Sequence, residues 1–172
     1  MYGMDKRKLR LMPHDAIWKD DFLSEKRRIE AAVDDSSIQI EHIGSTSIPN
    51  VWAKPILDIA ILCAAKNLEI VTDALVKVGY KYRGRYDEKD RHFYAVLDRE
   101  NVRLCQAHIY TEANDDWHLK LKFRDFLRQH PELAREYNEY KLDLAAKVFD
   151  KSKYAEIKSK WIDSFILKIA DF

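Results

Sequence analysis

Apolar positions recur along the chain with two different periods. Up to about residue 110, segments with helical spacing are mixed with segments that alternate or are continuously apolar, as in strands. This pattern predicts helices over residues 15–33 and 67–78, and strands over residues 38–43, 56–62, 80–85, 92–98 and 102–110. From residue 115 the spacing is helical, and breaks at Pro131 and at residues 150–152 divide it into three helices. The order predicts an α+β fold: a mixed β-sheet with flanking helices and a C-terminal helical half.

Length and composition limit the class of protein. A chain of 172 residues with 47% hydrophobic and 34% charged residues is expected to form a single domain over residues 1–172. The net charge of +1 gives no strong sign of DNA or RNA binding. The sequence holds no apolar run long enough for a membrane helix and no signal-peptide core near its start, so we expect a cytoplasmic protein. Cys63 and Cys105 lie in apolar runs and are expected to be buried reduced thiols. No feature sets the oligomeric state.

The segment from Ile40 to Leu62 carries the strongest chemical signal. It consists of a strand, a Gly-Ser loop and an apolar strand that contains one carboxylate, Asp58. A carboxylate in a buried strand is unfavourable unless it is paired or binds a cation. The loop Gly44–Ser47 offers backbone N–H groups and hydroxyls to an anion. Together they provide the minimum for a site that binds a metal and a phosphate.

The motifs HIGSTSIP and AKPILDI in this segment resemble the signature of the GrpB family. Residues 123–141 and 154–162 also resemble that family, so that the likeness covers about residues 12–168. The family is similar to an outlying branch of the nucleotidyltransferase superfamily. The resemblance therefore implies a nucleotidyltransferase-like fold, a nucleotide or small anionic ligand, and Mg²⁺ as the cofactor of an enzyme that would transfer a nucleotidyl group.

The metal site that the superfamily implies is incomplete in this chain. It resembles two carboxylates at positions i and i+2 of one strand, which hold two Mg²⁺ ions. Asp58 occupies the first position and is the candidate catalytic residue, but Ala60 occupies the second. His108 is the other candidate metal ligand. The resemblance implies a second histidine two residues earlier, but this chain has Gln106 there. Alternatively, Asp58 is a structural carboxylate that is hydrogen-bonded to the loop or to an arginine.

Candidate groups for binding phosphate or nucleotide come from the loop, from basic side chains and from helical tyrosines. They are Gly44, Ser45, Thr46, Ser47, Lys54, Arg91, Arg124, Arg128, Tyr137, Lys141 and Lys158. Each has a structural alternative: loop hydroxyls satisfy nearby backbone groups, arginines form ion pairs with residues such as Asp125, and lysine stems pack over tyrosines on a solvated face. Glu41 is a further candidate carboxylate, whereas His42 is expected to be partly buried and hydrogen-bonded.

These observations favour a nucleotidyltransferase-like protein that binds a nucleotide or another phosphate-containing small molecule through a degenerate metal site. One alternative is an active Mg²⁺-dependent nucleotidyltransferase, so the sequence leaves open whether the chain is an enzyme. Another alternative follows from the resemblance, because a GrpB-like domain is fused to dephospho-CoA kinase in some bacteria. It is a non-catalytic accessory module linked to coenzyme A or nucleotide metabolism.

Overall fold

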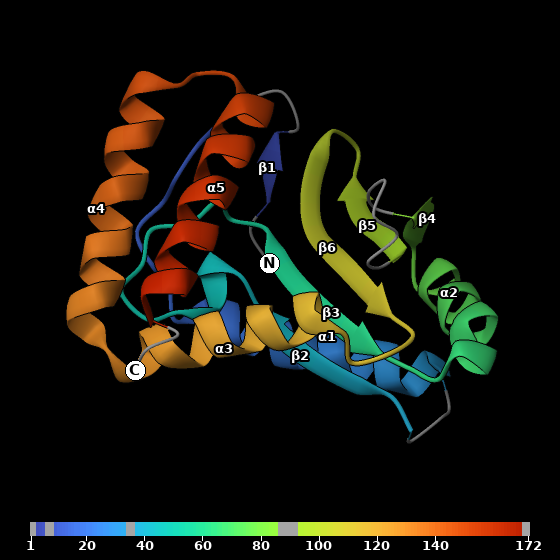
Figure 1. Ribbon diagram of the computed structural model, residues 1–172. Helices are drawn as coiled ribbons and strands as arrows, with labels where there is room; N and C mark the ends of the chain where they lie inside the picture. Colours follow the sequence, from blue (N-terminus) through green and yellow to red (C-terminus); the bar gives the residue numbers. More distant parts are fainter. Residues whose placement is uncertain (1–2, 6–8, 34–36, 86–92, 170–172) are drawn as a thin grey trace.

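A computed structural model describes residues 3–5, 9–33, 37–85 and 93–169 of the chain, and a mixed β-sheet forms its centre (Figure 1). The strands are β1 (Met4–Asp5), β2 (Gln39–Ile43), β3 (Leu57–Leu62), β4 (Tyr80–Arg85), β5 (Phe93–Arg99) and β6 (Val102–Tyr110). Their order in the sheet is β2-β3-β6-β5-β4, with β1 paired to β6. The central strands β3 and β6 are parallel, and the other pairs are antiparallel.

The helices are α1 (Ile17–Val33), α2 (Leu68–Lys77), α3 (Asp115–Gln129), α4 (Pro131–Lys147) and α5 (Lys151–Ile169). Two short 3-10 turns, η1 (Ser45–Ser47) and η2 (Ala65–Asn67), follow β2 and β3. Figure 1 shows α3, α4 and α5 together at one side of the sheet and α2 at the other. The predicted α+β fold with a C-terminal helical half is therefore confirmed, and most bounds move by one or two residues. The strand β1 was not predicted.

The start of α2 differs in detail from the prediction. Asn67 stands at the expected N-cap position but its side chain makes no capping hydrogen bond. The turn η2 precedes the helix directly and leads the chain into it. At the other end, Gly79 has a φ of +90°, as a glycine that terminates a helix commonly does.

The two faces of β3 belong to different layers of the molecule. Leu57, Ile59 and Ile61 pack in the main core with α1 and α2. Ala60 packs on the other face with Trp117 of α3. Side chains alternate along a strand, so Asp58 shares the face of Ala60. The carboxylate thus lies on the side of the sheet that the C-terminal half covers.

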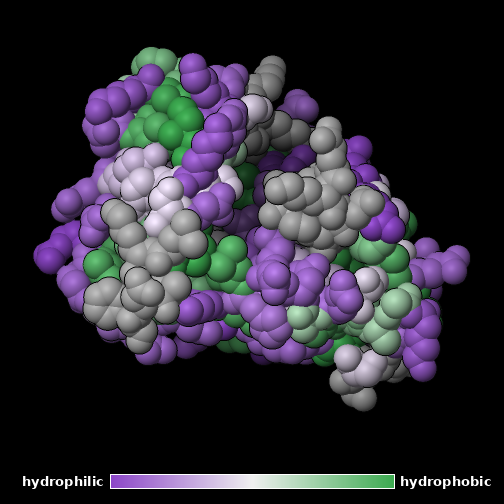
Figure 2. Space-filling model, in the orientation of Figure 1, coloured by the Kyte–Doolittle hydropathy of each residue, from purple (hydrophilic) through white to green (hydrophobic). Residues whose placement is uncertain are grey.

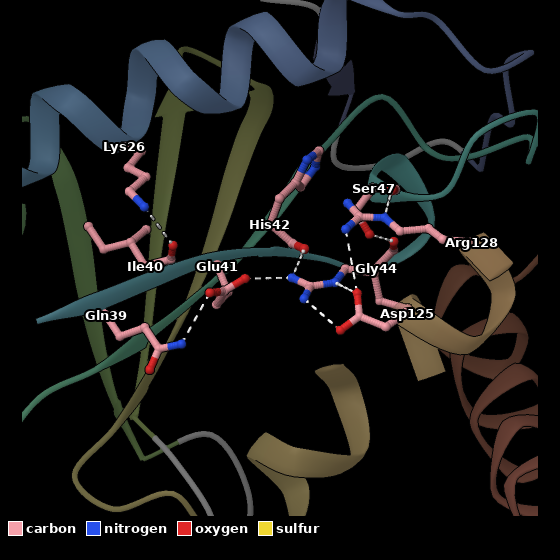
Figure 3. A network of polar contacts seen from close by, with 10 residues as sticks. Lys26, Gln39, Ile40, Glu41, His42, Gly44, Ser47, Asp125 and Arg128 are labelled. Carbon is pink, nitrogen blue, oxygen red and sulfur yellow. Dashed lines mark hydrogen bonds and ion pairs between the residues drawn. The ribbon is translucent and has the colours of Figure 1, made fainter. Parts of the chain in front are cut away.

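The outer strand β2 has its free edge capped by basic side chains from two helices (Figure 3). Lys26 of α1 donates a hydrogen bond to the Ile40 carbonyl at 3.3 Å, and Arg124 of α3 donates one to the His42 carbonyl at 3.0 Å. An unpaired strand edge is a template for association with another chain. These two contacts satisfy the carbonyls that such an association would use.

Two expectations from composition can be compared with the described residues. Cys63 and Cys105 are buried thiols that take no part in a disulfide, as predicted. Within the described ranges, every helix is too short or too polar to cross a membrane.

Candidate anion-binding site at Asp58

Asp58 lies near the start of β3, where the end of β2 and the middle of β6 flank it. In the strand register it stands opposite Ile43 on one side and Gln106 on the other. Gln106 donates a hydrogen bond from Nε2 to Oδ1 of Asp58 at 3.2 Å. The carboxylate therefore has one neutral donor within the sheet.

The Gly-Ser loop touches Asp58 directly. Gly44 has φ +71° and ψ −174°, a conformation that is essentially restricted to glycine. A Cβ atom at this position would overlap Oδ2 of Asp58 and lie 3.0 Å from its Cβ. Glycine is thus required here both by the backbone and by the close approach of the carboxylate. The expected proximity of Asp58 and the loop is present.

The three hydroxyls of the loop point in different directions. Ser45 Oγ lies 3.1 Å from the Tyr137 hydroxyl of α4, next to the Asp58 side of the loop. Thr46 Oγ1 lies 2.9 Å from Nε2 of His42 in the core, and Ser47 Oγ donates to the Gly44 carbonyl at 2.6 Å. For Thr46 and Ser47 the structural alternative therefore describes the contacts, and Ser45 is the hydroxyl best placed for a ligand.

Lysines from several elements act electrostatically on the carboxylate. The charges that act on Asp58 come, in decreasing order, from Lys158, Lys54, Lys120 and Lys141. Burial raises the pKa of Asp58, and these lysines oppose that rise. Asp58 retains some exposed surface. One carboxylate thus faces an excess of ammonium groups, an arrangement that attracts an anion.

Two side chains of α4 form hydrogen bonds with the loop that carries Lys54. Asn138 Oδ1 accepts a hydrogen bond from the Trp52 N–H at 2.7 Å, and Lys141 Nζ donates one to the Trp52 carbonyl. Both backbone groups of Trp52 are therefore satisfied by one helix, from side chains three residues apart. These two hydrogen bonds hold the backbone two residues before Lys54.

One tyrosine–lysine pair of the C-terminal helices, Tyr137 with Lys141, is buried rather than solvated. Lys141 Nζ lies 4.6 Å from the centre of the Tyr137 ring, and both side chains are only 1% exposed. Tyr154 is equally buried, and the lysine over its ring is Lys54, at 4.8 Å, instead of Lys158. The alternative of a solvated face is therefore wrong for Tyr137 and Lys141, whereas Lys158 is half-buried. The burial of both tyrosines also leaves little ring surface on which a base could stack.

Figure 2 shows the surface hollowed between α5 and strand β6. Hydrophilic surface lines part of this recess. Figure 1 has the same orientation and shows β3 and α5 on either side of this recess. Asp58 belongs to β3 and Lys158 to α5. The recess therefore lies between the sheet and the C-terminal helices.

Comparisons with known proteins identify the family of this chain. The sequence pattern of the GrpB protein family matches residues 8–168. The chain belongs to the GrpB family. It is 36% identical over 161 residues to the UPF0157 protein YqkA of Bacillus subtilis; this match covers 91% of the chain and 46% of YqkA. It is 23% identical to a dephospho-CoA kinase of Mycobacterium bovis over 88% of the chain and 44% of the kinase. The chain thus spans about half the length of these two relatives.

Solved structures confirm the fold of this GrpB family member. The conserved protein GrpB of Enterococcus faecalis superposes with a TM-score of 0.72 at 23% identity, over 91% of this chain and 99% of that one. The Cid1 poly(U) polymerase, in a structure with MgGTP bound, superposes with a TM-score of 0.53 at 12% identity, over 80% of this chain and 44% of that one. The predicted nucleotidyltransferase-like fold is therefore confirmed.

The position of the missing carboxylate is flanked by two other candidate ligands. In the register, Ala60 stands between Glu41 and His108, so all three share the face of Asp58. Glu41 is occupied by Arg124, whose Nη1 lies 2.7 Å from Glu41 Oε2. His108 is buried and lies beside the Tyr94 ring. Among the described residues, no three acidic, histidine or cysteine side chains are grouped so that they could hold a metal ion.

The predicted arginines lie apart from the lysines. Arg124 is buried and forms ion pairs with Glu41 and Asp125, both at 2.7 Å. Arg128 donates from Nε to the Ser47 carbonyl at 2.9 Å (Figure 3). Arg124 thus contacts the outer strand β2 and favours internal pairing, whereas Arg128 contacts the Gly-Ser loop. Arg91 lies outside the described residues, so its role stays a prediction.

Sequence reasoning missed three contributors to the site. The charge of Lys120 acts on Asp58 from α3. In the sequence, its spacing from Asp116 indicates only an i, i+4 ion pair within a helix, and the two residues do form that pair. Gln106 stands out in the sequence as a replaced histidine, and nothing there marks it as a donor to Asp58. Trp52 contributes backbone atoms, which the identity of a side chain does not reveal.

Proposed function

We propose that this protein binds a nucleotide or another phosphate-containing small molecule between the sheet and its C-terminal helices. The observation that carries the proposal is the convergence of Lys54, Lys120, Lys141 and Lys158 on one carboxylate. Ser45 belongs to the same loop as Gly44, which approaches Asp58 closely. Phosphates are bound by such combinations of ammonium groups and hydroxyls.

The residues around Asp58 do not fit a two-metal centre. Ala60 offers no ligand, and the neighbouring Glu41 is held by Arg124. The lysines would also repel a second cation. Asp58 and His108 are the side chains that would hold a single Mg²⁺ ion, which would supply charge neutralisation to a bound phosphate. We therefore expect binding to dominate and nucleotidyl transfer to be weak.

The likeness to the nucleotidyltransferase fold keeps an active enzyme as the competing hypothesis. Calorimetry with a nucleoside triphosphate, with and without Mg²⁺, should detect binding by the wild type and its loss in a Lys54→Glu/Lys158→Glu variant. A radiolabel-transfer assay on the wild type, Asp58→Ala and Ala60→Asp then tests chemistry. Turnover by the wild type that Asp58→Ala abolishes would establish the active enzyme. Absence of binding by the wild type would refute the proposal.

A second candidate is an accessory role in coenzyme A metabolism. The observation that favours it is the similarity to part of a dephospho-CoA kinase. Coenzyme A precursors carry phosphates that the same lysines would bind. Including dephospho-CoA beside nucleoside triphosphates in the calorimetry separates the two ligand classes: preferential binding of dephospho-CoA would favour the accessory role.

A further inference from the structure

A second hollow lies at the edge of the sheet, between α1 and α3 and beside the Gly-Ser loop. Its volume is about 440 Å³. We refer to it as the Arg128 hollow. Its lining includes the polar residues Lys19, Glu41, His42, Ser47, Arg124 and Arg128. Figure 3 shows three of its lining residues, His42, Ser47 and Arg128, near the end of the outer strand β2.

The charges of this hollow are unbalanced toward the positive side. Its single lining carboxylate, Glu41, is already bound by Arg124. His42 adds no charge, because burial and the nearby arginines lower its pKa to about 3. Lys19 and Arg128 are left to set the sign of the potential.

Arg128 has donors to spare. Its Nε is bonded to the Ser47 carbonyl, which fixes the plane of the guanidinium. Its Nη1 lies 3.5 Å from Oδ1 of Asp125, and Glu41 also acts on its charge. The side chain is 39% exposed, so its outer edge is accessible. A fixed guanidinium edge matches the two oxygens of a carboxylate or phosphate.

The remaining wall of the hollow is apolar. Ala16, Phe22, Leu23 and Pro49 line it, and Phe22 stacks on the His42 ring at 4.7 Å with an interplanar angle of 12°. Leu23 is 40% exposed although it is hydrophobic. An apolar wall opposite a fixed cation suits a ligand that has both characters.

We propose that the Arg128 hollow binds a small organic anion, in which a phosphate or carboxylate group is attached to an apolar body. The oxygens of the anion pair with Arg128 and with Lys19, and the body packs on Phe22 and Leu23. The site is distinct from the lysines that act on Asp58, because none of them lines the hollow. The protein then has two anion sites beside its Gly-Ser loop.

The experiment is a titration of the full chain with phenyl phosphate and with benzoate, followed by amide chemical shifts in NMR spectra. We expect saturable shifts at the amides of Leu23, His42 and Thr46. Arg128→Ala should weaken binding about tenfold, since a charge-assisted hydrogen bond is lost. The matched control Lys122→Ala removes an exposed charge of the same helix and should change affinity by less than about twofold in moderate salt.

Two more variants make the outcome decisive. Leu23→Glu places a carboxylate at the hollow without disturbing the core and should also weaken binding. Lys158→Glu removes charge from the Asp58 site and should leave binding in the Arg128 hollow unchanged. Shifts that do not saturate for either compound, or equal affinities for wild type and Arg128→Ala, would overturn the proposal. So would a loss of binding in Lys158→Glu, because the compounds would then occupy the Asp58 site.

Discussion

Lys141 carries an ammonium group into the interior of the C-terminal half. Its neighbours are the Tyr137 ring, the Trp52 carbonyl and the charges of Lys54 and Lys158. Burial lowers the pKa of Lys141 well below its usual value, and the two other lysines lower it further. A buried cation that forms no ion pair with any of the described residues opposes folding. Its presence is explained if the site serves an anion.

We predict that Lys141→Met stabilises the protein at pH 7 by about 1 kcal/mol while it weakens anion binding. The gain is limited because the Trp52 carbonyl loses a donor. The unfolded chain binds more protons than the folded one between the lowered and the ordinary pKa, so the stability of the wild type rises with pH in that interval. The advantage of methionine should therefore shrink as the pH rises toward about 10. Thermal unfolding measures it, with the exposed Lys147→Met as control; a destabilised Lys141→Met would contradict the argument.

Gly44 allows a clean test of the contact with Asp58. Gly44→Ala should lower the free energy of unfolding by about 2 kcal/mol or more, from backbone strain together with the overlap on Asp58. Gly84→Ala is the matched control, because Gly84 has a similar φ of +77° and none of the described residues comes within 4 Å of the point that its Cβ atom would occupy. It carries the strain without the clash. Denaturant unfolding of both variants separates the two effects, and equal losses would argue against a tight Asp58 contact.

The proposed anion site should also depend on pH. The raised pKa of Asp58 means that its negative charge is lost at a higher pH than usual, and the lowered pKa of Lys141 means that its positive charge is gained only as the pH falls. Both changes favour an anion at lower pH. We expect sulfate, which keeps its charge in this range, to stabilise the protein more at about pH 6 than at about pH 8. Thermal shifts at fixed sulfate concentration test this, and a stronger effect at the higher pH would contradict it.

At the scale of elements, the ion pairs of Arg124 join α3 to the outer strand β2. Arg124→Ala should cost about 3 kcal/mol, because it leaves Glu41 and the His42 carbonyl without their buried donor. Arg128→Ala should cost less than about 1 kcal/mol, since its side chain is partly exposed. Denaturant unfolding compares the two. Arg124→Ala also uncovers part of the strand edge, so sedimentation at increasing concentration should show self-association that Arg128→Ala does not share.

The elements themselves were predictable where a single period dominates. The continuous apolar run of β3 and the one-sided pattern of α1 identify both without tertiary information. The directions of Thr46 and Ser47 were not predictable, because the turn η1 aims adjacent hydroxyls at different layers. The separation of Arg124 and Arg128 from the lysines around Asp58 likewise depends on how α3 crosses β2, which no local pattern encodes.

At the scale of the whole molecule, the proposed anion site bridges two layers. Asp58 belongs to the sheet, whereas Lys141 and Lys158 belong to α4 and α5. A bound anion at 100 times its Kd should add roughly 2.7 kcal/mol of stability. We expect hydrogen exchange to slow most in α5 and in the loop around Trp52, because the anion neutralises charges that repel one another there. Equal slowing throughout the chain would indicate binding without this bridging role.

The parallel pairing of β3 with β6 also has a consequence for biosynthesis. Residues 63–101 separate the two central strands, so the ends of a long segment must come together before the strands pair, and such contacts form slowly. Lys141 and Lys158 emerge from the ribosome later still. A nascent chain that ends before α4 therefore has Asp58 and its Gly-Ser loop but lacks two of the surrounding ammonium groups. The proposed function thus implies that a ligand binds only a polypeptide that has been synthesised through α5, and acts only on this late state of folding.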